Sequence, residues 1–224
     1  TWDLSTGNTI NSLTLDFDYL AVAVHHSDGR VAVSDRSQLV VWDNTLSQKL
    51  AIRIDHMQAV PSIDWSPNGD VLASSIGFTD DVVLWNPVDG SSQSTLMGNG
   101  QQLNSIAWQP TGNHIAAGGL QGALVVWDTS IGSMIVNEIE AHQGTINDVA
   151  WSPDGSLLAT GSWDYTVKIW QLEPFQLLLT IEGHDGEVKS VAWNPTNLRQ
   201  IVSASKDTTV KVWDTTSGQL IKTF

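Results

Sequence analysis

The sequence predicts an all-β fold in which groups of short antiparallel strands recur at a fixed spacing. Residues 141–171 contain three apolar segments, INDVAW, SLLATGS and YTVKIW, separated by the turns SPDG and WD. Short segments rich in Val, Ile, Trp and Thr and bounded by turn residues are typical of antiparallel strands. The same pattern returns at 184–214 and, more loosely, at 99–128 and 56–86.

Tryptophan positions give the period of the repeat. The tryptophans that end the third segment follow one another at intervals of 42 or 43 residues, and they are Trp42, Trp85, Trp127, Trp170 and Trp213. Those that end the first segment keep the same spacing, and they are Trp65, Trp108, Trp151 and Trp193. A period in this range with four strands per repeat predicts a β-propeller in which each repeat forms one blade.

A Trp-Asp dipeptide closes the third segment at 2–3, 42–43, 127–128 and 213–214, and Trp-Asn or Trp-Gln replaces it at 85–86 and 170–171. Together with Gly183-His184 upstream in the same register, these motifs resemble the WD-repeat β-propeller family. The resemblance covers essentially the whole chain. It implies a fold of four-stranded antiparallel blades.

The repeats can be followed in chain order. Residues 1–15 are expected to end a preceding blade, with an outer strand at 9–15. Five blades follow, at approximately 16–54, 55–97, 98–139, 141–181 and 184–224. The first is the most degenerate, because it lacks both the Gly-His entry and the tryptophan of the inner strand, and its strands are expected at 19–24, 30–34 and 38–42.

The strand count predicts an incomplete ring. The sequence holds five full sets of the three inner strands but six outer strands, residues 9–15 being the extra one. Families of this type most often have seven blades, so the chain is expected to be a fragment of a larger ring whose missing strands lie upstream. The alternative is a closed five-bladed ring with one displaced end.

Composition restricts the classes of partner. The chain has 10 Lys and Arg residues against 24 Asp and Glu residues, a net charge of −14, which argues against nucleic-acid binding because a phosphate backbone requires a basic surface. The acidity favours solubility over selection for a basic partner. The absence of cysteine excludes disulfides and thiolate metal sites, and no apolar run is long enough to cross a bilayer. These features, with the lack of an N-glycosylation sequon, favour an intracellular, cytoplasmic protein.

Polar residues also recur at the repeat period. His56, His142 and His184 each precede the inner-strand tryptophan of their repeat by nine residues. In the family that the chain resembles, His, Ser or Thr, Asp and Trp form a hydrogen-bonded chain within a blade. Carried over, this implies two structural tetrads, which are His142, Ser162, Asp164 and Trp170 in the fourth blade, and His184, Ser205, Asp207 and Trp213 in the fifth.

The same residues could suggest catalysis or metal binding. A Ser, His and Asp set can support nucleophilic catalysis, but it occurs here more than once at the repeat period, whereas an active site needs one arrangement. Histidines one repeat apart lie in different blades, too far apart to share a metal ion. His25 and His26 are adjacent in a polar turn and are expected to be solvated. No catalytic residue, metal site or cofactor is therefore predicted.

The resemblance implies a non-enzymatic scaffold or adaptor that binds protein or peptide partners, within a larger complex. The family often uses the face that carries the loop before the inner strand and the turn before the third strand. The candidate partner-binding residues at those positions are Trp163, Phe78, Leu120, Lys206, Gln58, Gln101, Gln143, Thr145, Asp185 and Glu187. Large apolar side chains in turns are candidate anchors. Trp163 stands out among them, although it could equally pack on its neighbours.

Two other functional classes remain open. One is a regulatory sensor domain of a larger protein that also carries an ATPase, kinase or effector. The other is a propeller enzyme with its substrate in the central funnel, for which Asp64 and Asp148 on inner strands are the only obvious candidates, and these are too few.

Overall fold

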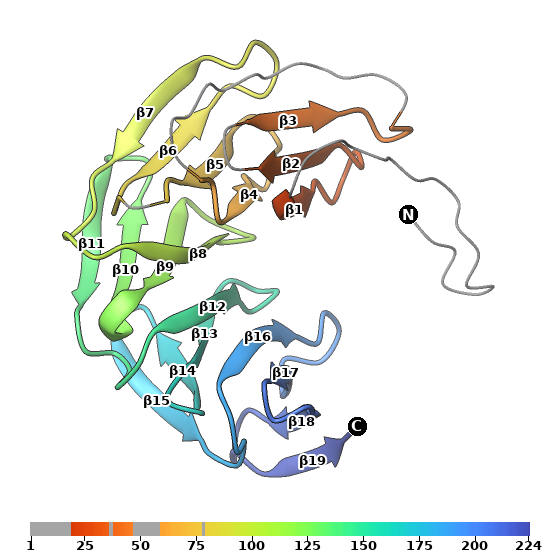
Figure 1. The fold of residues 1–224 in the computed structure, drawn as a ribbon, viewed down its shortest axis with the longest axis vertical. Helices are drawn as coiled ribbons and strands as arrows, with labels where there is room; N and C mark the ends of the chain where they lie inside the picture. The colour runs from red at the N-terminus through yellow and green to blue at the C-terminus, as the bar shows by residue number, and fades with distance from the viewer. Residues whose placement is uncertain (1–18, 36–37, 47–58, 78) are drawn as a thin grey trace.

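A computed structural model describes residues 19–35, 38–46, 59–77 and 79–224. Five antiparallel sheets follow one another around an arc, with the first and last sheets at its two ends (Figure 1). The predicted all-β propeller of four-stranded blades is confirmed, since four sheets have four strands, and three strands of the first sheet are described. The described residues contain no α-helix, only the short 3₁₀ turn η1 (Leu120–Gly122). No helix of this part of the chain is long and apolar enough to span a membrane.

We number the sheets blade 1 to blade 5 in chain order. Blade 1 has β1 (Tyr19–Val24), β2 (Val31–Asp35) and β3 (Leu39–Trp42). Blade 2 has β4 (Ile63–Trp65), β5 (Leu72–Ser75), β6 (Val82–Trp85) and β7 (Ser92–Leu96). Blade 3 has β8 (Leu103–Trp108), β9 (His114–Gly119), β10 (Leu124–Asp128) and β11 (Ser133–Glu138). Blade 4 has β12 (Ile146–Trp151), β13 (Leu157–Ser162), β14 (Val167–Gln171) and β15 (Gln176–Ile181). Blade 5 has β16 (Val188–Trp193), β17 (Gln200–Ser205), β18 (Val210–Asp214) and β19 (Leu220–Thr223).

The predicted outer strand at 9–15, and with it the count of outer strands, lies outside the described residues. His56, Gln58 and Phe78 also lie outside them. The proposal that the chain is part of a larger ring stays a prediction.

Each blade is an antiparallel meander in which neighbours in sequence are neighbours in the sheet. The first strand of each blade lies on the concave side of the arc and the last described strand on the convex side (Figure 1). Burial follows this order, because β5 and β6 are buried throughout whereas β7 is exposed except at Leu96. The core therefore lies between the blades, against the middle strands.

Four apolar clusters form this core, one at each seam between adjacent blades. Small residues in the second strands bring the blades close together. A Cβ atom on Gly118 would lie 2.3 Å from Cγ2 of Ile146 in the next blade, and one on Gly161 would lie 2.7 Å from Cγ1 of Val188. Both glycines are thus required by the approach of the following inner strand.

Hydrogen bonds also join the blades. At three seams the indole N–H of the inner-strand tryptophan donates to a carbonyl oxygen of the preceding blade: Trp65 to Ala23 at 3.3 Å, Trp151 to Ala107 at 3.1 Å and Trp193 to Ala150 at 3.0 Å. Each bond satisfies a polar group that packing would otherwise leave unpaired.

Asp148 in β12 connects three blades. Its Oδ1 accepts a hydrogen bond from Ser105 Oγ of blade 3 at 3.0 Å. Its Oδ2 accepts from Ser190 Oγ and from the backbone N–H of Val191, both in blade 5, at 2.8 and 2.9 Å. One side chain therefore links the inner strands of blades 3, 4 and 5.

Candidate functional site

The loops and turns predicted to share one face are hydrogen-bonded to each other. The turn before the third strand donates a backbone N–H to the loop before the inner strand in four blades: Gly77 to Ala59 at 2.5 Å, and Leu120 to Gln102, Trp163 to Thr145 and Lys206 to Glu187, each at 2.9 Å. The two kinds of connection therefore form a single loop-bearing face, best defined over blades 4 and 5.

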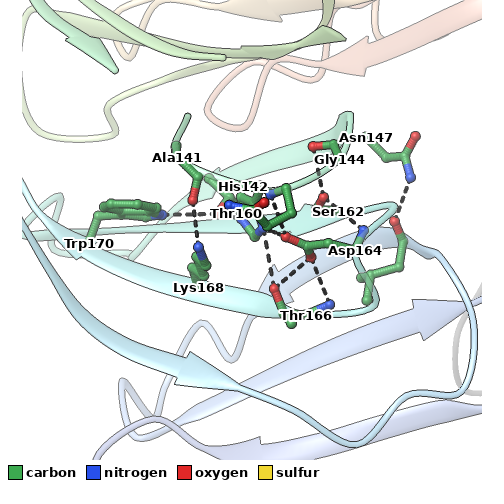
Figure 2. Close-up of polar contacts among 12 residues, drawn as sticks. Ala141, His142, Gly144, Asn147, Thr160, Ser162, Asp164, Thr166, Lys168 and Trp170 are labelled. Carbon is green, nitrogen blue, oxygen red and sulfur yellow. Dashed lines mark hydrogen bonds and ion pairs between the residues drawn. The ribbon is translucent and has the colours of Figure 1, made fainter. Parts of the chain in front are cut away.

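A continuous hydrogen-bond chain underlies this face in blade 4 (Figure 2). The Trp170 indole N–H donates to Thr160 Oγ1 at 2.9 Å, and the Thr160 hydroxyl donates to His142 Nε2 at 2.6 Å. His142 Nδ1–H donates to Asp164 Oδ2 at 2.8 Å. The Asp164 carboxylate also accepts the backbone N–H groups of Gln143 and Thr166, so it fixes both the loop and the turn.

Blade 5 repeats this chain. Trp213 donates to Ser203 Oγ at 2.8 Å, Ser203 donates to His184 Nε2 at 2.7 Å, and His184 Nδ1–H donates to Asp207 Oδ2 at 2.7 Å. The backbone N–H of Asp185 again donates to the carboxylate, at 3.0 Å.

The hydroxyl group in each chain corrects the sequence prediction. The sequence predicts Ser162 and Ser205, but the structure has Thr160 and Ser203. Residue 160 is two positions beyond Leu158, which pairs with Trp170, so its hydroxyl is the one within reach of the indole. A signal for this exists in the sequence, because Ser74, Thr160 and Ser203 lie 11, 10 and 10 residues before the tryptophan that each one binds.

Ser162 and Ser205 have a different place in the site. Ser162 Oγ donates to Gly144 O at 3.0 Å and accepts the backbone N–H of Asp164 at 3.1 Å. Ser205 does the same with Gly186 and Asp207, at 3.0 and 3.1 Å. These serines therefore tie the turn before the third strand to the loop before the inner strand.

Burial sets the electrostatics of the blade 4 chain. Desolvation lowers the pKa of His142, against the opposing effect of its bond to Asp164. For Asp164, burial alone would raise the pKa, but hydrogen bonds from His142 and Thr166 hold it well below its usual range. A neutral imidazole beside an ionised carboxylate matches the donor directions given above. The Thr160 side chain is fully buried, so its hydroxyl is not accessible to a substrate.

Trp163 lies at the tip of the blade 4 turn, above this chain. It is 48% exposed. Its indole N–H donates to Asn147 Oδ1 at 2.7 Å, and Lys189 Nζ of blade 5 lies 5.3 Å from the ring centroid. The side chain is thus held in one orientation while about half of its surface remains accessible.

The other predicted face residues divide by exposure. Lys206 is exposed and pairs with Glu187 at 3.1 Å, and the same carboxylate binds Lys189 at 2.5 Å. Gln143 and Asp185 are exposed, whereas Gln101, Leu120 and Glu187 are half-buried. Thr145 is a correction, because it is only 7% exposed and offers little side-chain surface to a partner.

Asp64 and Asp148, the candidates for a funnel enzyme, are held within the structure. Burial raises the pKa of both carboxyl groups, that of Asp64 to about 6. Both are engaged by donors from neighbouring blades, which at Asp64 is the backbone N–H of Trp108 at 2.7 Å. Among the described residues no group of three or more His, Cys, Asp or Glu side chains is placed to hold a metal ion.

Comparison with protein families matches the repeats directly. The model described as "WD domain, G-beta repeat" matches residues 47–86, 90–128, 133–171 and 175–214. Comparison with curated proteins finds no match.

Proposed function

Because this chain belongs to the WD-repeat family, we propose that it is a non-enzymatic scaffold that binds a protein or peptide partner on its loop-bearing face. WD-repeat propellers generally serve as protein-interaction scaffolds. Trp163, which lies in the blade 4 turn and contacts Lys189 of blade 5, is the proposed anchor.

The observation that carries this proposal is the arrangement of Trp163. A half-exposed tryptophan offers a large apolar surface, and tryptophan is enriched among the residues that dominate binding energy. Its hydrogen bond to Asn147 and its contact with Lys189 orient the ring before any partner arrives. Preorganisation of this kind reduces the conformational entropy lost on binding.

The surroundings of Trp163 support a binding role. Lys189, Lys206 and Glu187 form a charged rim beside the ring, linked through the Glu187 carboxylate. An apolar centre with a polar rim is the usual anatomy of a protein interface. Beneath it, the two tetrads hold the loops in place, so that the face is a fixed surface.

The experiment that tests the proposal compares partner capture by the wild-type chain and two variants. Trp163→Ala removes the anchor. Ile131→Ala is the matched control, because Ile131 is also an exposed apolar residue, at 66%, but lies in the turn between β10 and β11. Quantitative mass spectrometry should show partners that are retained by Ile131→Ala and lost by Trp163→Ala. Equal capture by all three proteins would contradict the proposed anchor.

A further inference from the structure

At the seam between blades 2 and 3, one position of the inner strand departs from the pattern of the other blades. The position just before the end of the inner strand is alanine in the other four blades, namely Ala23, Ala107, Ala150 and Ala192, but it is Asp64 in blade 2. Asp64 Oδ1 accepts the backbone N–H of Trp65 at 2.8 Å, and Oδ2 accepts that of Trp108 at 2.7 Å. A carboxyl group is thus inserted between two inner strands.

This substitution coincides with an unpaired donor. The indole N–H groups of Trp65, Trp151 and Trp193 all donate to the preceding blade. Trp108 is only 8% exposed, and its indole N–H is buried without a hydrogen-bond partner. A buried N–H without an acceptor costs about 1–3 kcal/mol, so this position calls for a ligand atom or a water molecule.

Trp108 and Asp64 line a cavity of about 230 Å³, together with His25, His26, Trp65 and Pro67. This volume is several times the ~30 Å³ that one water molecule occupies in the liquid. His25, which the sequence predicts to be solvated, is 3% exposed. Its Nδ1 is hydrogen-bonded to Asp28 Oδ1 at 2.8 Å, and its Nε2 is buried without a hydrogen-bond partner.

Arg30, whose guanidinium lies over the Trp65 ring, forms no ion pair with Asp64. Arg30 Nε donates to Asp28 Oδ2 at 2.7 Å, and its Nη2 donates to Gly69 O at 2.9 Å. Its guanidinium carbon lies 4.7 Å from the Trp65 ring centroid. No Lys or Arg of the described part of the chain forms an ion pair with Asp64, although a carboxylate in such a place is stabilised by a nearby cation.

We propose that this cavity binds the cationic side chain of an arginine or lysine from a basic peptide, with the cation against Asp64 and a peptide carbonyl oxygen on the Trp108 indole N–H. The cation supplies donors that the Asp64 carboxylate can accept, and the Trp65 and Trp108 rings offer the aromatic surface that cations favour. The net charge of −14 attracts a basic partner. This site uses none of the loop-face residues, so it stands independently of the proposed role of Trp163.

The test follows the indole N–H signal of Trp108 by ¹⁵N NMR, assigned with Trp108→Phe. The probes are N-acetyl-arginine amide and its neutral isostere N-acetyl-citrulline amide. The arginine probe should shift the signal and bind at least about tenfold more tightly than the citrulline probe. Guanidinium chloride, which lacks the carbonyl, should also bind more weakly than the arginine probe. Equal binding of guanidinium and the arginine probe would mean that the site takes a free cation rather than a peptide.

Two variants complete the test. Asp64→Ala places in blade 2 the residue that the other four blades carry, so it is expected to fold, and it should weaken the arginine probe at least about tenfold. Asp70→Ala removes an exposed carboxylate that does not line the cavity, and it should change binding by less than about twofold. Retained binding by Asp64→Ala, or no shift of the Trp108 signal with either probe at millimolar concentration, would overturn the proposal and leave a water-filled cavity.

Discussion

Lys189 of blade 5 holds its ammonium nitrogen 5.3 Å from the centre of the Trp163 ring of blade 4. The exposed tryptophan is therefore supported from two blades, since its indole N–H is bound by Asn147 of its own blade. Neither contact buries the ring, which keeps 48% of its surface accessible. Trp163 is thus fixed in direction but available for contact, and its contribution to binding can be separated from its contribution to folding.

Trp163→Ala should weaken binding of the loop-face partner by more than about 2 kcal/mol, with little change in melting temperature. The reason is that the ring contributes surface to the partner and little to the core. Isothermal calorimetry and thermal unfolding of the same samples measure the two effects. Ile131→Ala is the control for loss of an exposed apolar side chain. A Trp163→Ala variant that binds normally but melts early would identify the ring as a packing residue.

Thr160→Val should destabilise the domain by roughly 1–3 kcal/mol, whereas Thr160→Ser should cost less than about 1 kcal/mol. Valine has the shape of threonine but leaves both the Trp170 indole N–H and His142 Nε2 without a partner. Serine keeps the hydroxyl, as Ser203 does in blade 5. Urea denaturation compares the two variants, and equal midpoints for them would contradict a role for the hydroxyl.

Asp164→Ala should lower the free energy of unfolding by at least about 1–3 kcal/mol, and it should affect stability far more than it affects partner binding by the remaining folded protein. The carboxylate accepts from His142 and from the backbone of the adjoining loop and turn, and all these donors lose their acceptor. Chemical denaturation measures the loss. Asp128→Ala is a suitable control, since its hydrogen bonds are confined to an exposed turn. An unchanged midpoint for Asp164→Ala would be incompatible with the buried network.

The stability of the wild-type chain relative to Asp64→Ala should depend on pH between 4 and 7. Burial raises the pKa of Asp64 from 3.8 to about 6 in the folded state, so the folded protein binds the proton more tightly than the unfolded chain does. This stabilisation is complete below pH 3.8 and is lost as the pH rises through 6. From pH 7 to pH 4 the wild type should gain about 1–3 kcal/mol relative to Asp64→Ala. Parallel urea curves at both pH values measure it, and a pH-independent difference would contradict the assigned burial.

The sequence predicts the blades well because their signals repeat. The same turn residues and tryptophans return in each repeat, so an ambiguous strand in one repeat is identified by its equivalents in the others. The hydroxyl of the tetrad is predicted wrongly because residues 160 and 162 are both buried hydroxyl residues at the same pleat parity of β13. Only the pairing of Leu158 with Trp170 decides between them.

The cavity beside Asp64 could not be predicted from local sequence. A polar residue in a short strand is ordinary, and no motif marks a missing hydrogen bond. Whether the Trp108 indole N–H finds an acceptor depends on its distance from the preceding blade, which is a property of the assembled seam. The departure from alanine at position 64 is visible in the repeats, but the unpaired indole N–H of Trp108 beside it is visible only in the structure.

The Asp148 carboxylate has a consequence for how the blades unfold. In a linear array of repeats, stability is approximately the sum of each repeat and its contacts with adjacent repeats, and parts of such an array can melt separately. Because Asp148 binds Ser105 on one side and Ser190 on the other, the same carboxylate contributes both to the contact between blades 3 and 4 and to the contact between blades 4 and 5. Fraying of blade 5 leaves Asp148 Oδ2 without its donors and frees the side chain that also holds Ser105, so the two seams are coupled through one carboxylate.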